Sequence, residues 1–127
     1  MNNPDISNTP EDLYLSREAS MAAYCVGGGL EQIRKYNFTQ KGFFYSGMYQ
    51  FTSGLERLCK LILIYDFRSK NNNNFPNNEF IKNCGHNINS LFQKVKDINN
   101  LQVLKVDECF LSDNIYTLIV QFLNDFA

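Results

Sequence analysis

The longest hydrophobic pattern in the chain lies between residues 43 and 67. Apolar side chains recur there at alternating intervals of four and three, the spacing of one face of an α-helix. This main stripe consists of Phe44, Met48, Phe51, Leu55, Leu58, Ile62 and Tyr65. Near the C-terminal end the other faces also become apolar, at Cys59, Leu61, Leu63 and Ile64. The pattern therefore predicts a central helix that extends to about Ser69 and is buried on most sides.

A polar set follows the opposite face of the same helix. Its members are Tyr49, Ser53, Glu56 and Lys60. Glu56 and Lys60 are one helical turn apart, so they can form an ion pair of about 0.3–0.5 kcal/mol if they are exposed. The residues alone leave two interpretations open: a solvated face with a routine ion pair, or one half of a functional site.

A second helix precedes the central one, and a short turn joins them. Thr9 can cap this first helix, and Pro10 suits its first turn. The helix should run from Pro10 to about Tyr36. Its inward side chains should include Leu13, Ala19, Ala23 and Leu30. The turn at 37–39 is short, with Thr39 as the cap of the central helix, so the two helices should be antiparallel neighbours.

Three consecutive glycines, Gly27–Gly29, lie inside this first helix. Each costs roughly 1 kcal/mol of helix propensity relative to alanine. They form either a kink between two helices or a patch without side chains where another helix backbone packs closely. Continuity of the helix is favoured, because the helical pattern resumes at once over residues 31–34.

The pattern changes after the central helix. An asparagine-rich loop, residues 70–78, leads into a short helix over about 77–83, with Gly85 at a C-cap position. His86 should open the next helix, because apolar residues recur behind it at helical intervals. These residues are Ile88, Leu91, Phe92, Val95 and Ile98. Residues 101–111 fit either a helical turn or an extended link.

The whole chain is predicted to be all-α, an up-and-down bundle of four to five helices, because it shows no strand alternation and no internal repeat. Residues 112–114 should cap its last helix. Residues 1–8 are expected to form a disordered tail, and residues 9–127 a single domain. The last helix reaches Ala127 without a capping glycine, so we expect the sequence to be a fragment of a longer protein.

Charge and composition argue against several classes of function. The formal net charge is −1 and the pI about 5.8, so binding to a polyanion would have to use a local patch. The cysteines have neither a CxxC pair nor metal-ligand spacing, which favours structural thiols in a reducing cytoplasm over disulfides or zinc. They are Cys25, Cys59, Cys84 and Cys109. We expect no metal, no cofactor, no signal peptide and no association with a membrane.

His86 is the only histidine of the chain and a candidate for chemistry. Near a helix N-terminus it can act as a general acid or base around neutral pH, and the free backbone N–H groups there suit a phosphate. Lys82, Asn83 and Asn87 surround it with hydrogen-bond donors. The alternative is that His86 only caps the helix and packs locally.

These features together resemble the HEPN domain (higher eukaryotes and prokaryotes nucleotide-binding). The resemblance is carried by the run SGLERLCKLILIY, a loop holding Pro76, and the run CGHNINSLF. Members commonly have a glutamate and a lysine in a long second helix and then, after a loop, a histidine that opens a helix. The matching residues here are Glu56, Lys60, His86, Ile88 and Leu91. The helix order matches over residues 10–126, and the specific part lies within residues 53–92.

The resemblance implies a four- or five-helix bundle that forms a homodimer through the central helix region. Many members are metal-independent ribonucleases of toxin–antitoxin, abortive-infection or CRISPR-linked defence systems. In those, an Arg-x(4–6)-His motif from each of two protomers meets at one cleft, and a ribose 2′-OH attacks the adjacent phosphate. This chain has no arginine in residues 79–85, and Lys82 lacks the bidentate fork of arginine. Arg57, a segment beyond Ala127 or a second protomer would have to supply one.

Three functions therefore fit the sequence. The first is a dimerising HEPN-like module that binds nucleotide, RNA or a partner, such as an antitoxin or a further domain of the same protein. The second is a metal-independent endoribonuclease that uses His86 with Glu56, Lys60 or Lys82. The third is a plain helical interaction domain. The expected ligand-binding residues are Lys82, Asn83, Asn87 and Tyr49, and the candidate catalytic residues are His86, Glu56 and Lys60.

Overall fold

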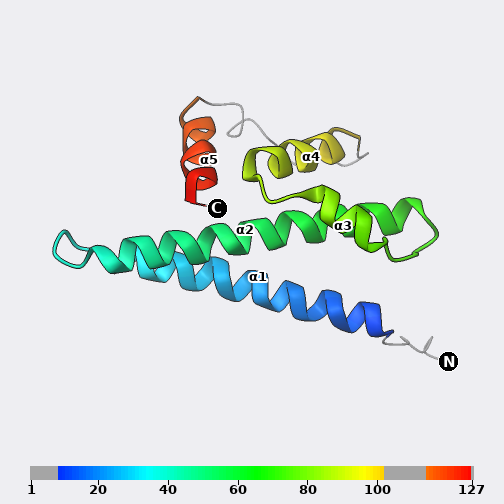
Figure 1. Ribbon diagram of the computed structural model, residues 1–127, viewed down its shortest axis with the longest axis horizontal. Coiled ribbons are helices and arrows are strands. Elements are labelled where there is room, and N and C mark those ends of the chain that lie inside the picture. The colour runs from blue at the N-terminus through cyan, green and yellow to red at the C-terminus, as the bar shows by residue number, and fades with distance from the viewer. Residues whose placement is uncertain (1–8, 102–113, 127) are drawn as a thin grey trace, which may run out of the picture.

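The computed structural model describes residues 9–101 and 114–126 (Figure 1). The helices of these ranges are α1 (Pro10–Arg34), α2 (Lys41–Lys70), α3 (Asn78–Cys84), α4 (Ile88–Leu101) and α5 (Asn114–Phe126). The predicted all-α class is thus confirmed for the described residues. The predictions for the N-terminal tail, for the link after residue 101 and for the cap at residues 112 and 113 fall outside these ranges.

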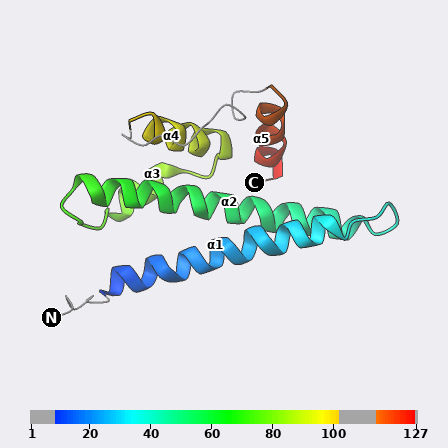
Figure 2. The same cartoon turned by 180° about the vertical axis from the view of Figure 1, so that it is seen from behind.

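The central position predicted for α2 is confirmed. This helix contacts each of the other four helices. It forms an antiparallel pair with α1 on one side, α4 and α5 lie on the other, and α3 runs beside α2 (Figures 1 and 2). The bundle therefore has two layers that share α2, and α5 crosses α2 steeply (Figure 1).

Most of the helix caps predicted from the sequence are present in the structure. Thr9 caps α1 by accepting a hydrogen bond from the backbone N–H of Asp12 at 3.2 Å. Gly85 ends α3 with a positive φ of 71°, as expected of a C-cap glycine. The predicted cap at Thr39 is wrong: Gln40 occupies the N-cap of α2. The Thr39 hydroxyl instead donates to the side chain of Asn37 at 2.7 Å and stabilises the turn.

A line of glycines, Gly29, Gly47 and Gly54, joins α1 to α2, and we call it the glycine seam. A Cβ atom added at Gly29 would lie 2.6 Å from the backbone nitrogen of Phe51. One added at Gly54 would lie 2.7 Å from the backbone nitrogen of Val26. The helix α1 is therefore continuous through Gly27–Gly29, as favoured from the sequence, and the last of these glycines is the close-packing patch.

The seam also decides which face of α1 is buried. Leu15 and Ala22 pack with Leu61 and Ile64 of α2 in one core cluster. The predicted inward residues of α1 are wrong, because all four are exposed to solvent: Leu13, Ala19, Ala23 and Leu30. The sequence pattern could not tell which side of α1 would meet the glycines of α2, and among the described helices only α2 contacts α1 extensively.

The second core cluster lies on the opposite side of α2. It consists of Cys59, Leu63, Cys84 and Leu91, with Phe80, Phe92, Val95 and Ile98 packed against them. The main stripe predicted for the central helix is only partly buried. Met48 is its one fully buried member, whereas Leu58 and Tyr65 are exposed and the remaining four are half-buried. The apolar residues at the C-terminal end of α2 supply the core instead.

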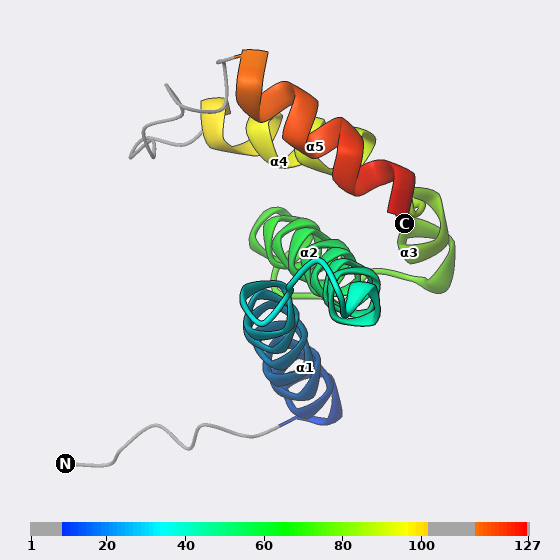
Figure 3. The same ribbon diagram turned by 90° about the vertical axis from the view of Figure 1, so that its left-hand side faces the viewer.

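The α1–α2 pair consequently has two flanks. On both helices, residues spaced three or four positions apart lie along one side of the glycine seam, as expected at 3.6 residues per turn. We call this side of the pair the uncharged flank. Its residues are Ala19, Ala23, Val26, Leu30, Phe51, Leu55, Leu58, Ile62 and Tyr65. The other side, the charged flank, carries Glu18, Ser53, Glu56, Arg57 and Lys60. Figure 3 shows α3 along one side of the α1–α2 pair and no described helix along the other.

Candidate functional site

Three of the residues singled out in the sequence meet on the charged flank. Lys60 Nζ donates to Glu56 Oε1 at 2.7 Å, and His86 Nδ1 lies 2.6 Å from the same oxygen. Lys60 Nζ is 3.4 Å from His86 Nδ1. Glu56 therefore links a residue of its own helix to one 30 positions further along the chain. We call these three residues the cluster.

The contacts define the state of the imidazole. An ionised carboxylate only accepts hydrogen bonds, so His86 Nδ1 must carry a proton to make its 2.6 Å contact with Glu56. The Lys60 ammonium then cannot donate to Nδ1, and its 3.4 Å contact places a positive charge beside the ring. In the neutral imidazole, Nε2 is left as the proton acceptor. The His86 side chain is 82% exposed, so this nitrogen is accessible to a ligand.

Contacts of the neighbouring residues hold His86 in this position. Gly85 makes the turn out of α3, and the Asn87 side chain accepts from the backbone N–H of Ser90 in the first turn of α4. The N–H of Ile88 donates to the side chain of Asn124 from α5 at 2.7 Å. Ile88 is itself fully buried. His86 thus lies two residues before α4, not at its first position as predicted, because Asn87 is the better cap.

Glu56 is held in its charged form. Burial has the largest single effect and raises the pKa of its carboxyl. The hydrogen bonds from Lys60 and His86, together with the positive charges of those groups, outweigh burial and keep the pKa below its ordinary value of 4.5. The side chains of Glu56 and Lys60 are only 22% and 20% exposed, so solvent screens the pair incompletely.

A pocket of about 300 Å³ adjoins the cluster. It lies between α1, α2 and α3 and is lined by Tyr14, Glu18, Ser53, Glu56, Arg57, Lys60, Leu61, Ile64 and Ile81. Arg57 crosses from α2 to pair with Glu18 of α1 at 2.7 Å. Arg57 was one of the candidate sources of an arginine, and it lies in the same pocket as Glu56 and Lys60.

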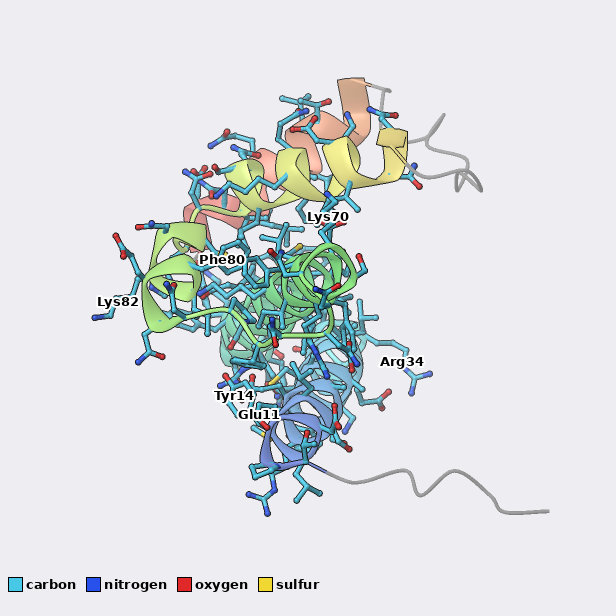
Figure 4. The ribbon with its side chains drawn as sticks, turned by 90° about the vertical axis from the view of Figure 1, so that its right-hand side faces the viewer. Glu11, Tyr14, Arg34, Lys70, Phe80 and Lys82 are labelled. Carbon is cyan, nitrogen blue, oxygen red and sulfur yellow. The ribbon has the colours of Figure 1, made fainter. Side chains whose placement is uncertain are left out.

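The other predicted ligand residues lie apart from the cluster. Lys82 is on the outer side of α3 and points away from α1 and α2 (Figure 4). Asn83 lines a different pocket of about 370 Å³, and its carbonyl accepts from Lys94 at 3.4 Å. Asn87 caps α4. Tyr49 is 68% exposed and does not line the pocket beside the cluster. The structure therefore brings together His86, Glu56 and Lys60 but not these four.

The two lining residues that come from α1, Tyr14 and Glu18, were missed in the sequence. They are four apart and share one side of α1, which was a usable signal. Their meeting with α2, however, depends on the register that the glycine seam imposes. Because the predicted inward face of α1 was wrong, the sequence could not place Glu18 opposite Arg57.

The three cysteines within the described residues do not line this site. Cys25, Cys59 and Cys84 are free thiols, and Cys109 lies outside the described residues. Burial, helped by the nearby Glu56 carboxylate, raises the pKa of the Cys59 thiol to about 11, so it stays neutral in the core at pH 7. Within the described ranges, no group of three or more His, Cys, Asp or Glu side chains is placed to hold a metal ion. In the same ranges no helix combines the length and apolar character needed to cross a membrane.

Comparison with protein-family models, with curated proteins and with solved structures found no match to this chain. The functional proposals below therefore depend on the geometry of the cluster and on the resemblance of its residues to the HEPN motif.

Proposed function

We propose that this chain is a HEPN-like module that binds a phosphate-containing ligand, a nucleotide or RNA, at the cluster. The supporting observation is the meeting of Glu56, Lys60 and His86 within 3.4 Å, because these are the same residues that carry the resemblance. Lys60 and Arg57 supply cationic donors beside an accessible imidazole, a combination suited to phosphate oxygens. Within the site, the carboxylates of Glu18 and Glu56 balance the cationic groups of Arg57 and Lys60. By the same resemblance, the module belongs to a prokaryotic defence or toxin–antitoxin system.

Fluorescence anisotropy with a short labelled single-stranded RNA tests the proposed binding. Lys60→Gln and His86→Gln should each weaken binding about ten-fold, the usual effect of losing a hydrogen bond to a charged group. The matched control is Lys82→Gln, which removes a lysine that points away from the cluster. Absence of binding by the wild type, or equal losses in all three variants, would refute the proposal.

The partner that we propose for the uncharged flank is a second copy of this chain. None of its nine side chains is charged, so the flank can face itself without burying an unpaired charge. The contacts of Gly54 with Val26, and of Arg57 with Glu18, fix the register of the two helices. In this register the small Ala19 lies at the same height along the helix pair as the large Ile62, and Ala23 at the same height as Leu58.

A two-fold axis parallel to the helices would pack α2 of each copy against α1 of the other. Large side chains of one protomer would then fill the space over the alanines of its partner, and the four helices would form an antiparallel bundle. The two clusters would lie on the outer sides of this dimer. Such an arrangement differs from the shared cleft of the catalytic HEPN members and therefore favours binding over cleavage.

A second candidate function, metal-independent RNA cleavage, is favoured by one contact. Glu56 orients His86 through Nδ1, as a carboxylate does in general acid–base sites, and leaves Nε2 as the base. In this reaction Nε2 would take the proton of a ribose 2′-OH while its oxygen bonds to phosphorus. The bond from phosphorus to the 5′ oxygen would break, this oxygen would take a proton from solvent water, and Lys60 would stabilise the developing negative charge.

Cleavage can be separated from binding by incubating RNA with the protein and a metal chelator. A ribonuclease should leave 2′,3′-cyclic phosphate ends, and His86→Ala should abolish the products. Identical patterns from wild type and His86→Ala would exclude this function while leaving the binding proposal intact.

A further inference from the structure

The pocket beside the cluster has two chemically different ends. Toward Ser53 and Glu56 its lining is polar, and the cationic groups of Arg57 and Lys60 are paired there with the carboxylates of Glu18 and Glu56. Toward the N-terminal part of α1 and the adjoining α3 the lining turns apolar and aromatic. This second end is formed by Tyr14, Leu61, Ile64 and Ile81. A ligand that fills the whole pocket must therefore combine a polar end, able to compete for the paired charged groups, with an apolar one.

The Tyr14 ring is held in place at the apolar end. It makes an edge-to-face contact with Phe75, with ring centroids 5.9 Å apart and an interplanar angle of 83°. The side chain is nevertheless 45% exposed, so part of its surface is free to contact a ligand. Leu61 and Ile64 are buried and form the floor beside it. Figure 4 shows Tyr14 on the same side of the molecule as α3, opposite Arg34.

The distances along α2 match a ligand with two ends. Ile64 is one helical turn from Lys60 and two turns from Arg57, which corresponds to roughly 6 and 10 Å at 1.5 Å per residue. A nucleotide carries a flat, largely apolar base and a phosphate on opposite ends of its ribose. Inorganic phosphate or a sugar phosphate would leave the aromatic end of the pocket unused.

From this we infer that the Tyr14 end of the pocket is a nucleobase subsite. The base would stack on Tyr14 above Leu61 and Ile64, and the phosphate would face Arg57, Lys60 and His86. Base–aromatic stacking is largely independent of base identity, so the subsite would accept a nucleotide either free or within RNA. The inference rests on the function proposed above, because it assigns the other half of the ligand bound at the cluster.

Isothermal titration with three probes tests it: adenosine 5′-monophosphate, ribose 5-phosphate and inorganic phosphate. The nucleotide should bind at least ten-fold more tightly than ribose 5-phosphate. Tyr14→Ala should remove this advantage, weakening nucleotide binding roughly ten- to hundred-fold while ribose 5-phosphate is unaffected. Tyr14→Phe keeps the ring and should retain the advantage. The matched control is Tyr24→Ala, which truncates another exposed tyrosine of α1 that does not line the pocket.

The possible outcomes separate the two proposals. Equal affinity for the nucleotide and for ribose 5-phosphate would overturn the base subsite and leave phosphate binding at the cluster intact. Retained nucleotide preference in Tyr14→Ala would also overturn it. If none of the three probes binds, the proposed function fails, and the subsite fails with it. Thermal melts of Tyr14→Ala and Tyr14→Phe show whether the loss of the Phe75 contact has altered the fold.

Discussion

The two flanks of the α1–α2 pair are built on the same seam but have opposite chemistry. The charged flank holds two ion pairs, Glu18–Arg57 and Glu56–Lys60, and a pocket between three helices. The uncharged flank presents aliphatic and aromatic side chains without a charge among them. One hairpin can thus serve two purposes: residues on one side of the seam can bind a polar ligand while those on the other pack against a partner.

The difference shows why apolar periodicity is an incomplete guide to a core. Leu58 and Tyr65 continue the same helical stripe as the buried Met48, yet both are exposed. An apolar stripe indicates which side of a helix is shielded from water in the functional assembly. It does not indicate whether the surface that covers this side belongs to the same chain. We expect a second copy of the chain to cover the uncharged flank.

The largest effect should come from breaking the seam that both flanks share. In Gly29→Ala the new Cβ would lie within 2.8 Å of backbone atoms of Gly47 and Phe51, so the helices must separate. Overpacking of this kind should lower the free energy of unfolding by about 2 kcal/mol. Urea denaturation measures the change.

The neighbouring Gly27→Ala is the control for that experiment. A Cβ at Gly27 meets nothing within 4 Å in the described part of the chain. It should therefore stabilise α1 by about 0.5–1 kcal/mol through helix propensity alone. Equal effects at the two positions would mean that the seam does not determine the packing of α1 on α2.

Next in size is a charge placed on the uncharged flank. Leu58→Glu would bury a carboxylate against the partner copy, and it should weaken dimerisation at least thirty-fold, corresponding to about 2 kcal/mol for a central interface residue. Sedimentation velocity over a range of concentrations measures this. Tyr24→Glu is the comparison, because Tyr24 is 70% exposed but lies outside this flank. A wild type that stays monomeric at tens of micromolar would contradict the dimer.

The fold was more accessible from the sequence than the site. The helix pattern of the central segment, the cap at Thr9 and the stop at Gly85 are local features, so they could be predicted from neighbouring residues. The pairing of Glu18 with Arg57 spans 39 positions and depends on the glycine seam, which no periodicity reveals. Glu56, Lys60 and His86 were singled out from local features and joined into one site by their resemblance to a motif, whereas Tyr14 and Glu18 have no counterpart in that motif.

A smaller effect should appear in the pH dependence of stability on the charged flank. The folded pKa of Glu56 is below 4.5, so its contribution is complete above that pH and is lost as the pH falls through the folded pKa. The difference in unfolding free energy between wild type and Glu56→Gln should be below about 1 kcal/mol at pH 7 and should shrink between pH 5 and 3. Asp12 and Glu31, whose pKa values are also lowered, are present in both proteins and cancel. A difference independent of pH would mean that the ionised carboxylate contributes nothing.

The smallest change in stability should come from His86 itself. Its side chain is 82% exposed, and its neighbours Ile88 and Asn87 hold the turn without it, so His86→Gln should alter the free energy of unfolding by less than about 0.5 kcal/mol. The same variant should still weaken RNA binding about ten-fold. Urea denaturation and fluorescence anisotropy on one preparation compare the two effects. If His86→Gln weakens RNA binding without changing the free energy of unfolding, His86 contributes to ligand binding and not to the fold. If it changes neither quantity, the cluster is an ordinary solvent-exposed face without a binding function.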